Sequence, residues 1–456
     1  MLTLLGLALA APASVSLADR AGAGLLEQHV PRLGGWAWRS AIQAPHLHTD
    51  RDVGAAGVAM AFIALYDTTH ERAYLRGARH AGDFLLAAAQ RADGGLRWPD
   101  YVDPGRTADT RFTSFDDGAA GIADLLWQLG ERTGDGRYTR AGLAGMAWLR
   151  AQALGAAGRP CPELCRWLYF DDAGDDYRTG MGEGIAGIAY AFDAFARRTH
   201  DPSYEGYATG AAAYLEHLMT PAGAIPEVPD ETGYNTGFLS GDAGQAFLFL
   251  TLYAHTGDGR WLRDARRALA WVRSHAIATR GGLAWPIEVD PRDGDDRDNA
   301  TGIEEGAAGI GWVYLQAYAV THDGAYLDTA RSAARWLRRV ARHEHGGMAW
   351  PEDAGQRVVH TSLDNGAPGI GWFLDDVARV TGSRPDAAAA RSAAAWLRAV
   401  AHRDGRGAYW YEYRNGRAWH LRADPSWHWG SAGIAAFLAR LRGWPVDMPG
   451  EEPGLP

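Results

Sequence analysis

The sequence predicts an all-α fold, an (α/α)7 toroid in which seven inner and seven outer helices surround a central cavity. Three observations predict it: a motif that recurs seven times, two helical patterns after each copy, and a matching helix at the N-terminus. The motif is Gly-x-x-Gly before an apolar run, at spacings of 57 to 66 residues, so one unit repeats along most of the chain. Its first glycines are Gly54, Gly118, Gly184, Gly241, Gly306, Gly366 and Gly430.

The apolar run after each motif predicts an inner helix. In the fifth copy, residues 310–315 (IGWVYL) are apolar on every side, which is typical of a helix that is buried all round. A polar turn follows, and then residues 325–340 place apolar side chains at helical spacing while arginines occupy the other face. This second helix is amphipathic and therefore belongs to the outer ring.

Short extended or hairpin-like segments complete each unit. Glycine-rich, aromatic stretches end the outer helices and lead to the next motif, and their composition favours short strands joined by turns. They begin at Gly94, Gly281, Gly346 and Gly407.

The N-terminal segment predicts that the ring closes. Residues 18–30 (ADRAGAGLLEQHV) resemble an outer helix and precede GGWAW at Gly34, just as other outer helices precede GGLAW. This helix would be the partner of the last inner helix, which has no outer helix after it. The alternative, an open solenoid of helical hairpins, would need atypical capping repeats at both ends. Because the last motif is regular, the closed ring is favoured.

Composition agrees with a large core and excludes two classes of partner. The 456 residues are 47% hydrophobic and 22% charged, and the net charge is −10. No basic patch of the kind that nucleic acid requires is present. The apolar N-terminal stretch, residues 2–10, is too short to span a bilayer. We therefore expect no nucleic-acid partner and no membrane span.

The chain divides into three parts. Residues 14–445 are predicted to form the single toroid domain, and the proline-rich residues 446–456 a disordered tail. Residues 1–13 have the apolar run and small-residue site of a short signal peptide but no positive charge ahead of the run. A signal peptide would place the protein in the periplasm or outside the cell, whereas an extension of the first outer helix would leave it in the cytoplasm.

The chain has two cysteines, Cys161 and Cys165, in the segment CPELC. Two cysteines alone cannot complete a closed zinc site. Four positions apart in a loop flanked by prolines, they could form a local disulfide in an exported protein. Half of a metal site is the other interpretation.

The seven motifs, each opening an inner helix after a tryptophan-containing turn, resemble the lanthionine synthetase C-like family over residues 18–444. The resemblance implies an (α/α)7 toroid related to the six-hairpin glycosidase folds. In the family's peptide cyclases, a zinc ion is held by a cysteine two residues before the fifth motif and by Cys-His just before the sixth. This sequence has Glu304, Asp364 and Asn365 there, so we expect no metal and no cofactor, although carboxylates and an imidazole can also bind zinc.

Acidic residues lie within two positions of the first glycine of most motifs, and the toroid would gather them at one mouth of the cavity. Carboxyl groups that lie close together push their pKa values apart, which suits general acid–base catalysis on a glycosidic or uronic-acid linkage. Capping of the helix N-terminus is the competing interpretation for any single acid. The candidate catalytic residues are Glu183, Glu304, Glu305, Asp364 and His428, and the candidate substrate-binding acids are Asp52, Asp116 and Asp117.

Tryptophans in the turns before the motifs are candidates for sugar contacts, because pockets that combine aromatic walls with a few polar groups suit such ligands. The alternative, packing as core between neighbouring repeats, is preferred for most of them. Trp427 and Trp429, which flank His428, are the two expected to be exposed. The full set of candidates is Trp98, Trp285, Trp350, Trp427 and Trp429.

Three functions remain open. The first is a carbohydrate-active hydrolase or lyase that uses carboxylates in the cavity, in line with the acids, the tryptophans and export. The second, a zinc-independent peptide cyclase or modifying protein, rests on the family resemblance alone. The third is a non-catalytic scaffold that presents a peptide or glycan. We favour them in that order, with a saccharide or peptide in the central cavity as the partner.

Overall fold

The computed structural model describes most of the chain. The described residues are 16–40, 46–155, 161, 163–170, 174, 176–229, 231–290, 292, 294–295, 299–411, 413–414, 417–418 and 423–441. The predicted signal peptide, residues 1–13, and the predicted tail, residues 446–456, lie outside them.

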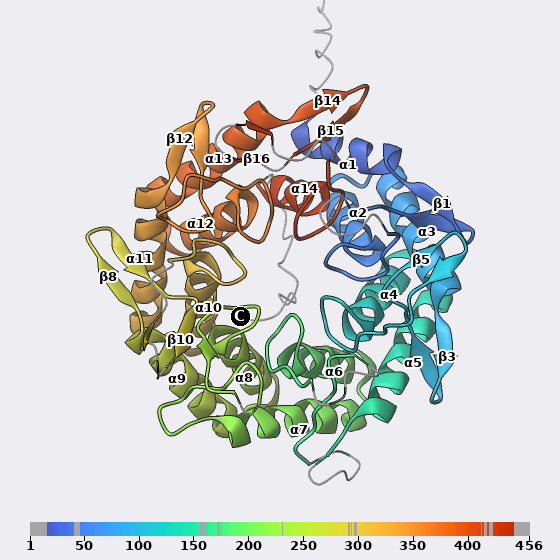
Figure 1. Cartoon of the computed structure of the whole chain (residues 1–456), viewed down its shortest axis with the longest axis horizontal. Helices are drawn as coiled ribbons and strands as arrows, with labels where there is room; N and C mark the ends of the chain where they lie inside the picture. The colour runs from blue at the N-terminus through green and yellow to red at the C-terminus, as the bar shows by residue number, and fades with distance from the viewer. Residues whose placement is uncertain are drawn as a thin grey trace, which may run out of the picture.

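The helices form two concentric rings (Figure 1). The inner ring contains α2 (Ala55–Thr69), α4 (Ala119–Thr133), α6 (Ile185–Thr199), α8 (Asp242–Thr256), α10 (Ala307–Thr321), α12 (Ala367–Thr381) and α14 (Ser431–Arg440). The outer ring contains α1 (Leu17–Glu27), α3 (Arg72–Ala88), α5 (Gly136–Gln152), α7 (Pro202–Leu218), α9 (Gly259–Ser274), α11 (Gly324–Val340) and α13 (Arg384–Val400). This arrangement confirms the predicted all-α (α/α)7 toroid. In the described part of the chain, no helix has the length and apolar character needed to cross a membrane.

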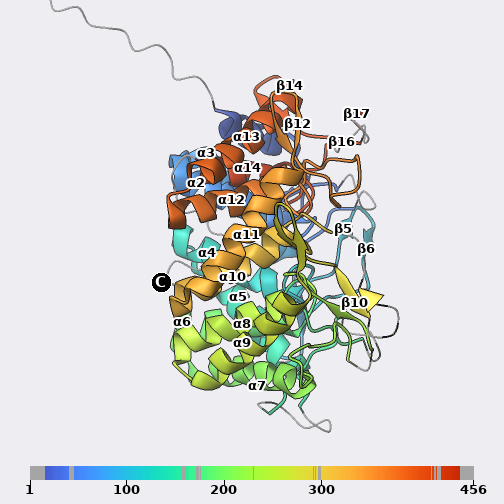
Figure 2. The same cartoon turned by 90° about the vertical axis from the view of Figure 1, so that its left-hand side faces the viewer.

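Short antiparallel strands follow the outer helices, and Figure 2 shows them with the loops on one side of the helical ring. The hairpins are β1 (Val30–Arg32) with β2 (Gly35–Ala37), β3 (Gln90–Ala92) with β4 (Gly95–Arg97), β5 (Val102–Asp103) with β6 (Arg106–Thr107), β8 (Ile277–Thr279) with β9 (Gly282–Ala284), β12 (Arg342–Glu344) with β13 (Gly347–Ala349), β14 (His402–Asp404) with β15 (Gly407–Tyr409), and β16 (Tyr413–Arg414) with β17 (Arg417–Ala418). A three-stranded sheet has the order β11 (Gly294–Asp295), β10 (Glu288–Asp290), β7 (Tyr234–Asn235). The predicted hairpin-like segments are therefore confirmed.

The N-terminal helix closes the ring. Helix α1 packs against both α14 and α2, so it is the outer partner of the last inner helix. The indole N–H of Trp38 donates to the carbonyl oxygen of Leu25 in α1 at 2.8 Å. The backbone of Gly24 lies against Ala408 of β15, which leaves no space for a side chain. The closed ring is thus confirmed, and the open solenoid is excluded.

Both glycines of the motif are required by the backbone. The first glycine precedes each inner helix, and a Cβ atom on it would lie only 2.2 to 2.5 Å from backbone atoms of the loop before it. A Cβ atom on the second glycine would lie only 1.8 to 2.2 Å from the carbonyl oxygen of the residue three positions before the first glycine. The glycines of the repeated motif are therefore needed because each loop folds back closely over its own helix.

Tryptophans tie the hairpins to the outer helices. The indole N–H groups of Trp98, Trp285 and Trp350 each donate to a carbonyl oxygen 13 residues earlier in an outer helix, at 2.8 to 2.9 Å. A proline follows each of them, and its carbonyl oxygen accepts a hydrogen bond from a motif loop, as from Thr49 to Pro99 at 2.7 Å. The three indoles are at most 2% exposed. They belong to the core, which is the interpretation preferred above for most of the tryptophans, so these three are removed as candidates for sugar contacts.

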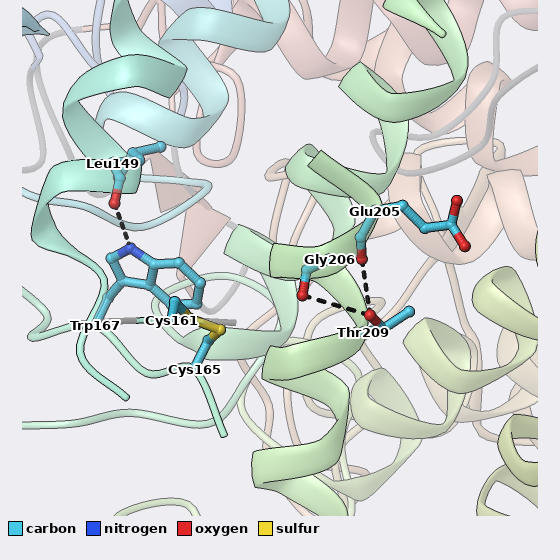
Figure 3. Close-up of a disulfide and its surroundings, with 7 residues drawn as sticks. All are labelled: Leu149, Cys161, Cys165, Trp167, Glu205, Gly206 and Thr209. Carbon is cyan, nitrogen blue, oxygen red and sulfur yellow. Dashed lines mark hydrogen bonds between the residues drawn. A yellow bond between two sulfur atoms is a disulfide. The ribbon is translucent and has the colours of Figure 1, made fainter. Parts of the chain in front are cut away.

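Cys161 and Cys165 form a disulfide in the loop between α5 and α6 (Figure 3). The interpretation as half of a metal site is therefore wrong. The buried Cys165 donates its backbone N–H to the carbonyl oxygen of Gly210 in α7 at 2.9 Å. Nearby, the indole N–H of Trp167 donates to Leu149 in α5 at 2.7 Å. The disulfide loop thus bridges two neighbouring outer helices.

Removal of the disulfide is expected to have a modest effect. The double variant Cys161→Ser/Cys165→Ser should lose about 2 kcal/mol of unfolding free energy, because a short closed loop restricts the unfolded chain only slightly. Urea denaturation would measure this loss, and a thiol reductant should reproduce it in the native protein but leave the variant unchanged. A variant as stable as the native protein would contradict the prediction.

Candidate active site

Seven loops meet at the centre of the ring, one before each inner helix. We call the residues two positions before the first motif glycines the annulus, which consists of Asp52, Asp116, Gly182, Leu239, Glu304, Asp364 and His428. Each annulus carbonyl oxygen accepts at least one backbone hydrogen bond of 2.7 to 3.2 Å from the loop of the preceding repeat. Asp52 of the first repeat accepts from Trp427 of the last, so the hydrogen bonds form a complete circle.

A second layer of side chains lies between the annulus and the inner helices. We call it the floor, and it consists of Arg51, Phe115, Met181, Phe238, Ile303, Leu363 and Trp427. Floor side chains pack over the second motif glycine of the next repeat, as Phe115 packs over Gly187. All seven are buried. Trp427, at 2% exposure, is therefore a core residue, and the expectation that it is exposed is wrong.

A third layer borders the mouth of the ring on the hairpin side. We call it the rim, and it consists of the residues directly before the motif glycines, Val53, Asp117, Glu183, Ser240, Glu305, Asn365 and Trp429. Val53 is buried and the other six are half-buried. Trp429 is thus partly accessible, whereas Trp427 is not, because the two flank His428 in opposite layers.

His428 is the centre of an acidic cluster in the annulus. Its Nδ1 lies 3.1 Å from Oδ1 of Asp364 and 3.7 Å from Oδ1 of Asp52. Its Nε2 lies 3.9 Å from Oδ1 of Asp116. Glu304 completes the cluster, since polar atoms of Glu304, Asp364 and His428 all lie within 4.8 Å of one another. Five of the predicted site residues are therefore brought together by the fold.

Three groups of the cluster, Asp52, Glu304 and His428, keep their protons to a higher pH than the free side chains do. Burial raises the pKa of Asp52 and of Glu304 well above their usual values, and nearby carboxylates add to this while His428 opposes it. Burial alone would lower the pKa of His428, but Asp364 and Asp116 raise it well above the usual value. Carboxyl groups and an imidazole with raised pKa values thus lie beside two further aspartates, an arrangement that favours proton transfer.

Asp117 and Glu183 form a separate polar group on the rim. Burial and two neighbouring aspartates raise the pKa of Asp117 to about 7, and Asp117 accepts a hydrogen bond from the hydroxyl of Tyr169 at 2.9 Å. Arg178 lies 4.1 Å from the centroid of the Tyr169 ring and forms an ion pair with Glu183. Because the carboxylate of Glu183 is paired with Arg178, the structure argues against the catalytic role expected for Glu183.

Glu305 also lies apart from the His428 cluster. Its carboxyl group turns toward the preceding repeat, where Oε1 accepts the backbone N–H of Ser240 at 3.0 Å and Oε2 lies against Gly237. Burial raises its pKa to about 8. The two adjacent glutamates therefore differ in role, and only Glu304 joins the cluster.

The annulus and floor line a cavity of about 40 Å³. Its polar lining comes from Asp116, Glu304, Asp364 and His428, and the rest is apolar. Because one water needs roughly 10–15 Å³ in this measure, the cavity has room for a few waters and not for a sugar ring. A larger ligand would bind at the mouth, where Asp52 and Glu304 are the half-buried acids of the annulus.

The cluster does not fit the zinc ion of the peptide cyclases. The distances among Glu304, Asp364 and His428 would allow a cation, but the set lacks the thiolates that the family's zinc uses. Asp364 and Asp116 raise the pKa of His428, so a metal bound there would have to displace the proton that they favour. Asn365 offers no stronger ligand, so we derive no step through zinc.

Three polar residues near the site are not among those predicted from the sequence. Tyr169 and Arg178 lie in loops before motifs, and no local pattern distinguishes them from solvated residues. Arg51 does carry a signal, because the position three residues before the first glycine is apolar in the other six repeats. Comparison of the repeats position by position would have identified it.

Comparisons with known proteins agree with this architecture. The sequence matches the lanthionine synthetase C-like protein family over residues 175–444, more than half of the chain. No curated protein matches it. Similar solved structures include nisin cyclase, with a TM-score of 0.59 and 12% identity over 88% of this chain and 90% of that one. A D-mannose isomerase has a TM-score of 0.56 and 12% identity over 78% of this chain and 94% of that one. A sugar epimerase from a ruminal bacterium has a TM-score of 0.53 and 12% identity over 95% of this chain and 98% of that one. Such low identities indicate a shared fold.

Proposed function

The chain belongs to the lanthionine synthetase C-like family, and from that premise we propose a carbohydrate-active enzyme, of the glycoside hydrolase or lyase type, acting at the mouth of the ring. The observation that carries the proposal is the cluster of Glu304, Asp364 and His428, whose polar atoms lie within 4.8 Å of one another. General acid–base catalysis needs a proton donor and an acceptor side by side. The similar structures that act on sugars, a D-mannose isomerase and a sugar epimerase, support a sugar ligand.

The proposed roles follow from accessibility and proton affinity. Glu304 is half-buried and its pKa is raised, so it can donate a proton to a leaving oxygen at the mouth. Asp52, on the other side of His428, is also half-buried with a raised pKa, and such a carboxyl group is a stronger base once ionised. It would take a proton from water in hydrolysis or from a sugar carbon in elimination. After the reaction Asp52 holds one proton too many and Glu304 one too few, and His428, which lies beside Asp52 and is held by Asp364, would pass that proton from Asp52 back to Glu304.

A panel of saccharides followed by proton NMR would test the proposal. The panel should contain neutral oligosaccharides, unsaturated uronides and free aldoses, so that hydrolysis, elimination and isomerisation give different products. We expect turnover of at least one glycoside or uronide, unchanged by a metal chelator. Turnover of none, or activity that disappears with the chelator and returns with zinc, would contradict it.

A peptide-modifying function is the second candidate, favoured by the family and by the likeness to nisin cyclase. A cyclase without zinc would need another group to accept a thiol proton, and Asp52 is the available base. Formation of a thioether in a dehydrated, cysteine-containing peptide would support this function. Binding of such a peptide with no change in its mass would instead favour the scaffold.

A further inference from the structure

One charged residue interrupts the apolar floor. The equivalent positions in the other repeats hold Phe115, Met181, Phe238, Ile303, Leu363 and Trp427, whereas the first repeat has Arg51. Arg51 is 1% exposed. A guanidinium stays charged in proteins. Its burial therefore opposes folding unless an opposite charge lies close to it.

The contacts of Arg51 hold its side chain in one direction. Its Cδ packs where a Cβ on Gly121 would otherwise lie, 2.3 Å away. Its Nε lies 3.1 Å from Sδ of Met60, and its Cζ lies 4.0 Å from the centroid of the Phe115 ring. Nη1 then lies 3.9 Å from Oδ1 of Asp116. The apolar neighbours therefore aim the guanidinium at the annulus.

The same Asp116 oxygen connects Arg51 to the centre of the acidic cluster. Oδ1 of Asp116 lies 3.9 Å from Nη1 of Arg51 and 3.9 Å from Nε2 of His428. Asp364 faces the other ring nitrogen of His428 at 3.1 Å. The imidazole thus lies between Asp364 and Asp116, and Asp116 also lies beside the guanidinium of Arg51.

Stability alone does not explain the arginine. Replacement of a buried ion pair by apolar residues of similar volume is often neutral or stabilising, and a residue that costs stability is commonly retained for function. The third repeat places Met181 at the same position, which shows that an unbranched apolar side chain fits this layer.

We propose that Arg51 is a positioning residue that holds the Asp116 carboxylate against Nε2 of His428 from the floor, without contact with the substrate. The inference rests on the proposed function for its catalytic consequence. Without Arg51, Asp116 would be free to turn toward His428 alone, and the imidazole would lose its fixed orientation between the two aspartates.

The variant Arg51→Met tests this role. We expect a melting temperature equal to or above that of the native protein, kcat lower by about 10- to 100-fold, and an unchanged KM, because misplacement near a reacting group costs rate of this order. Arg51→Lys should recover part of kcat, since it restores the charge without the planar fork. Arg331→Met, which removes a half-exposed arginine from α11, is the matched control and should alter neither constant.

A readout that needs no substrate separates this proposal from the proposed function. The imidazole signal of His428 can be identified in NMR spectra by its loss in His428→Asn. In Arg51→Met its titration midpoint should rise, because a nearby positive charge has been removed, whereas Arg51→Lys should lie between. This result would support the positioning role even if no saccharide is turned over.

Two results would overturn the proposal. One is a folded Arg51→Met protein with native kcat and an unchanged His428 midpoint. The other applies if Arg51→Met does not fold: a folded Arg51→Lys with native kcat and midpoint would show that any buried cation suffices and that the guanidinium does not position Asp116.

Discussion

Replacement of Gly187 by alanine is expected to prevent the ring from forming. A Cβ at this position would lie 1.9 Å from the carbonyl oxygen of Met181 and 2.7 Å from Cβ of Phe115. Neither can retreat, because Met181 and Phe115 belong to loops that are hydrogen-bonded into the closed circle. Overpacking typically costs about 1 to 3 kcal/mol and occasionally more, and we expect this variant at the upper end because the contact is with backbone, although alanine favours a helix over glycine. Circular dichroism during thermal melting would show early or non-cooperative unfolding.

Gly259→Ala is the matched control for this prediction. Gly259 is also a helical glycine, at the start of α9, but a Cβ there would meet no heavy atom within 4 Å. We expect a melting temperature equal to or slightly above that of the native protein. If the two variants melted alike, close backbone packing would not be the reason for the motif.

Replacement of Glu304 by glutamine is expected to have the largest effect on activity. Loss of a general acid typically reduces rate by about 10² to 10⁴-fold, and glutamine preserves the shape of the side chain while removing the proton. KM should change much less than kcat. The saccharide that the native protein turns over would serve as substrate, and Asp328→Asn, an exposed acid on α11, should behave as the native protein.

The pH profile gives a second test of Glu304. Because burial and Asp364 raise its pKa, Glu304 keeps its proton to a higher pH than a free glutamate does, and activity should fall as the pH rises through that pKa. The neighbouring variant Glu305→Gln should retain this alkaline decline and lose less activity, because Glu305 is held by Ser240 away from the cluster. A native alkaline decline in Glu304→Gln would exclude Glu304 as the acid.

The ring could be predicted from the sequence because its constraint is local and repeated. A second glycine at Gly57 or Gly121 is needed wherever the loop folds back over its own helix, so the motif marks each inner helix. Residues 18–30 repeat the pattern of the outer helices, which made closure predictable. The tryptophans were harder to interpret, since an indole suits both a core and a sugar platform. The common distance of 13 residues between Trp98, Trp285 or Trp350 and its acceptor in the outer helix marks a structural role for these three.

The site could be predicted only in part. Positions relative to the motif brought Glu304, Asp364 and His428 to the same layer, because equivalent residues of repeats meet around a ring. Adjacent residues of an extended loop turn to different sides, so Glu304 and Glu305 separated in a way that composition did not indicate. The pairing of Glu183 with Arg178 depends on the course of a variable loop, for which the repeat offers no rule.

The circle of backbone hydrogen bonds has a consequence for how the protein is made. The carbonyl oxygen of Asp52 accepts a hydrogen bond from the backbone N–H of Trp427, and helix α1 packs against α14. The first and last repeats can therefore meet only after the last repeat has left the ribosome. Contacts between such distant segments slow folding, because a long loop must close before they form. His428 belongs to the last repeat, so it is synthesised after the other residues of the acidic cluster. A chain released before the last repeat would therefore contain most of the helices but would lack both the closing contacts of the ring and the histidine of the acidic cluster.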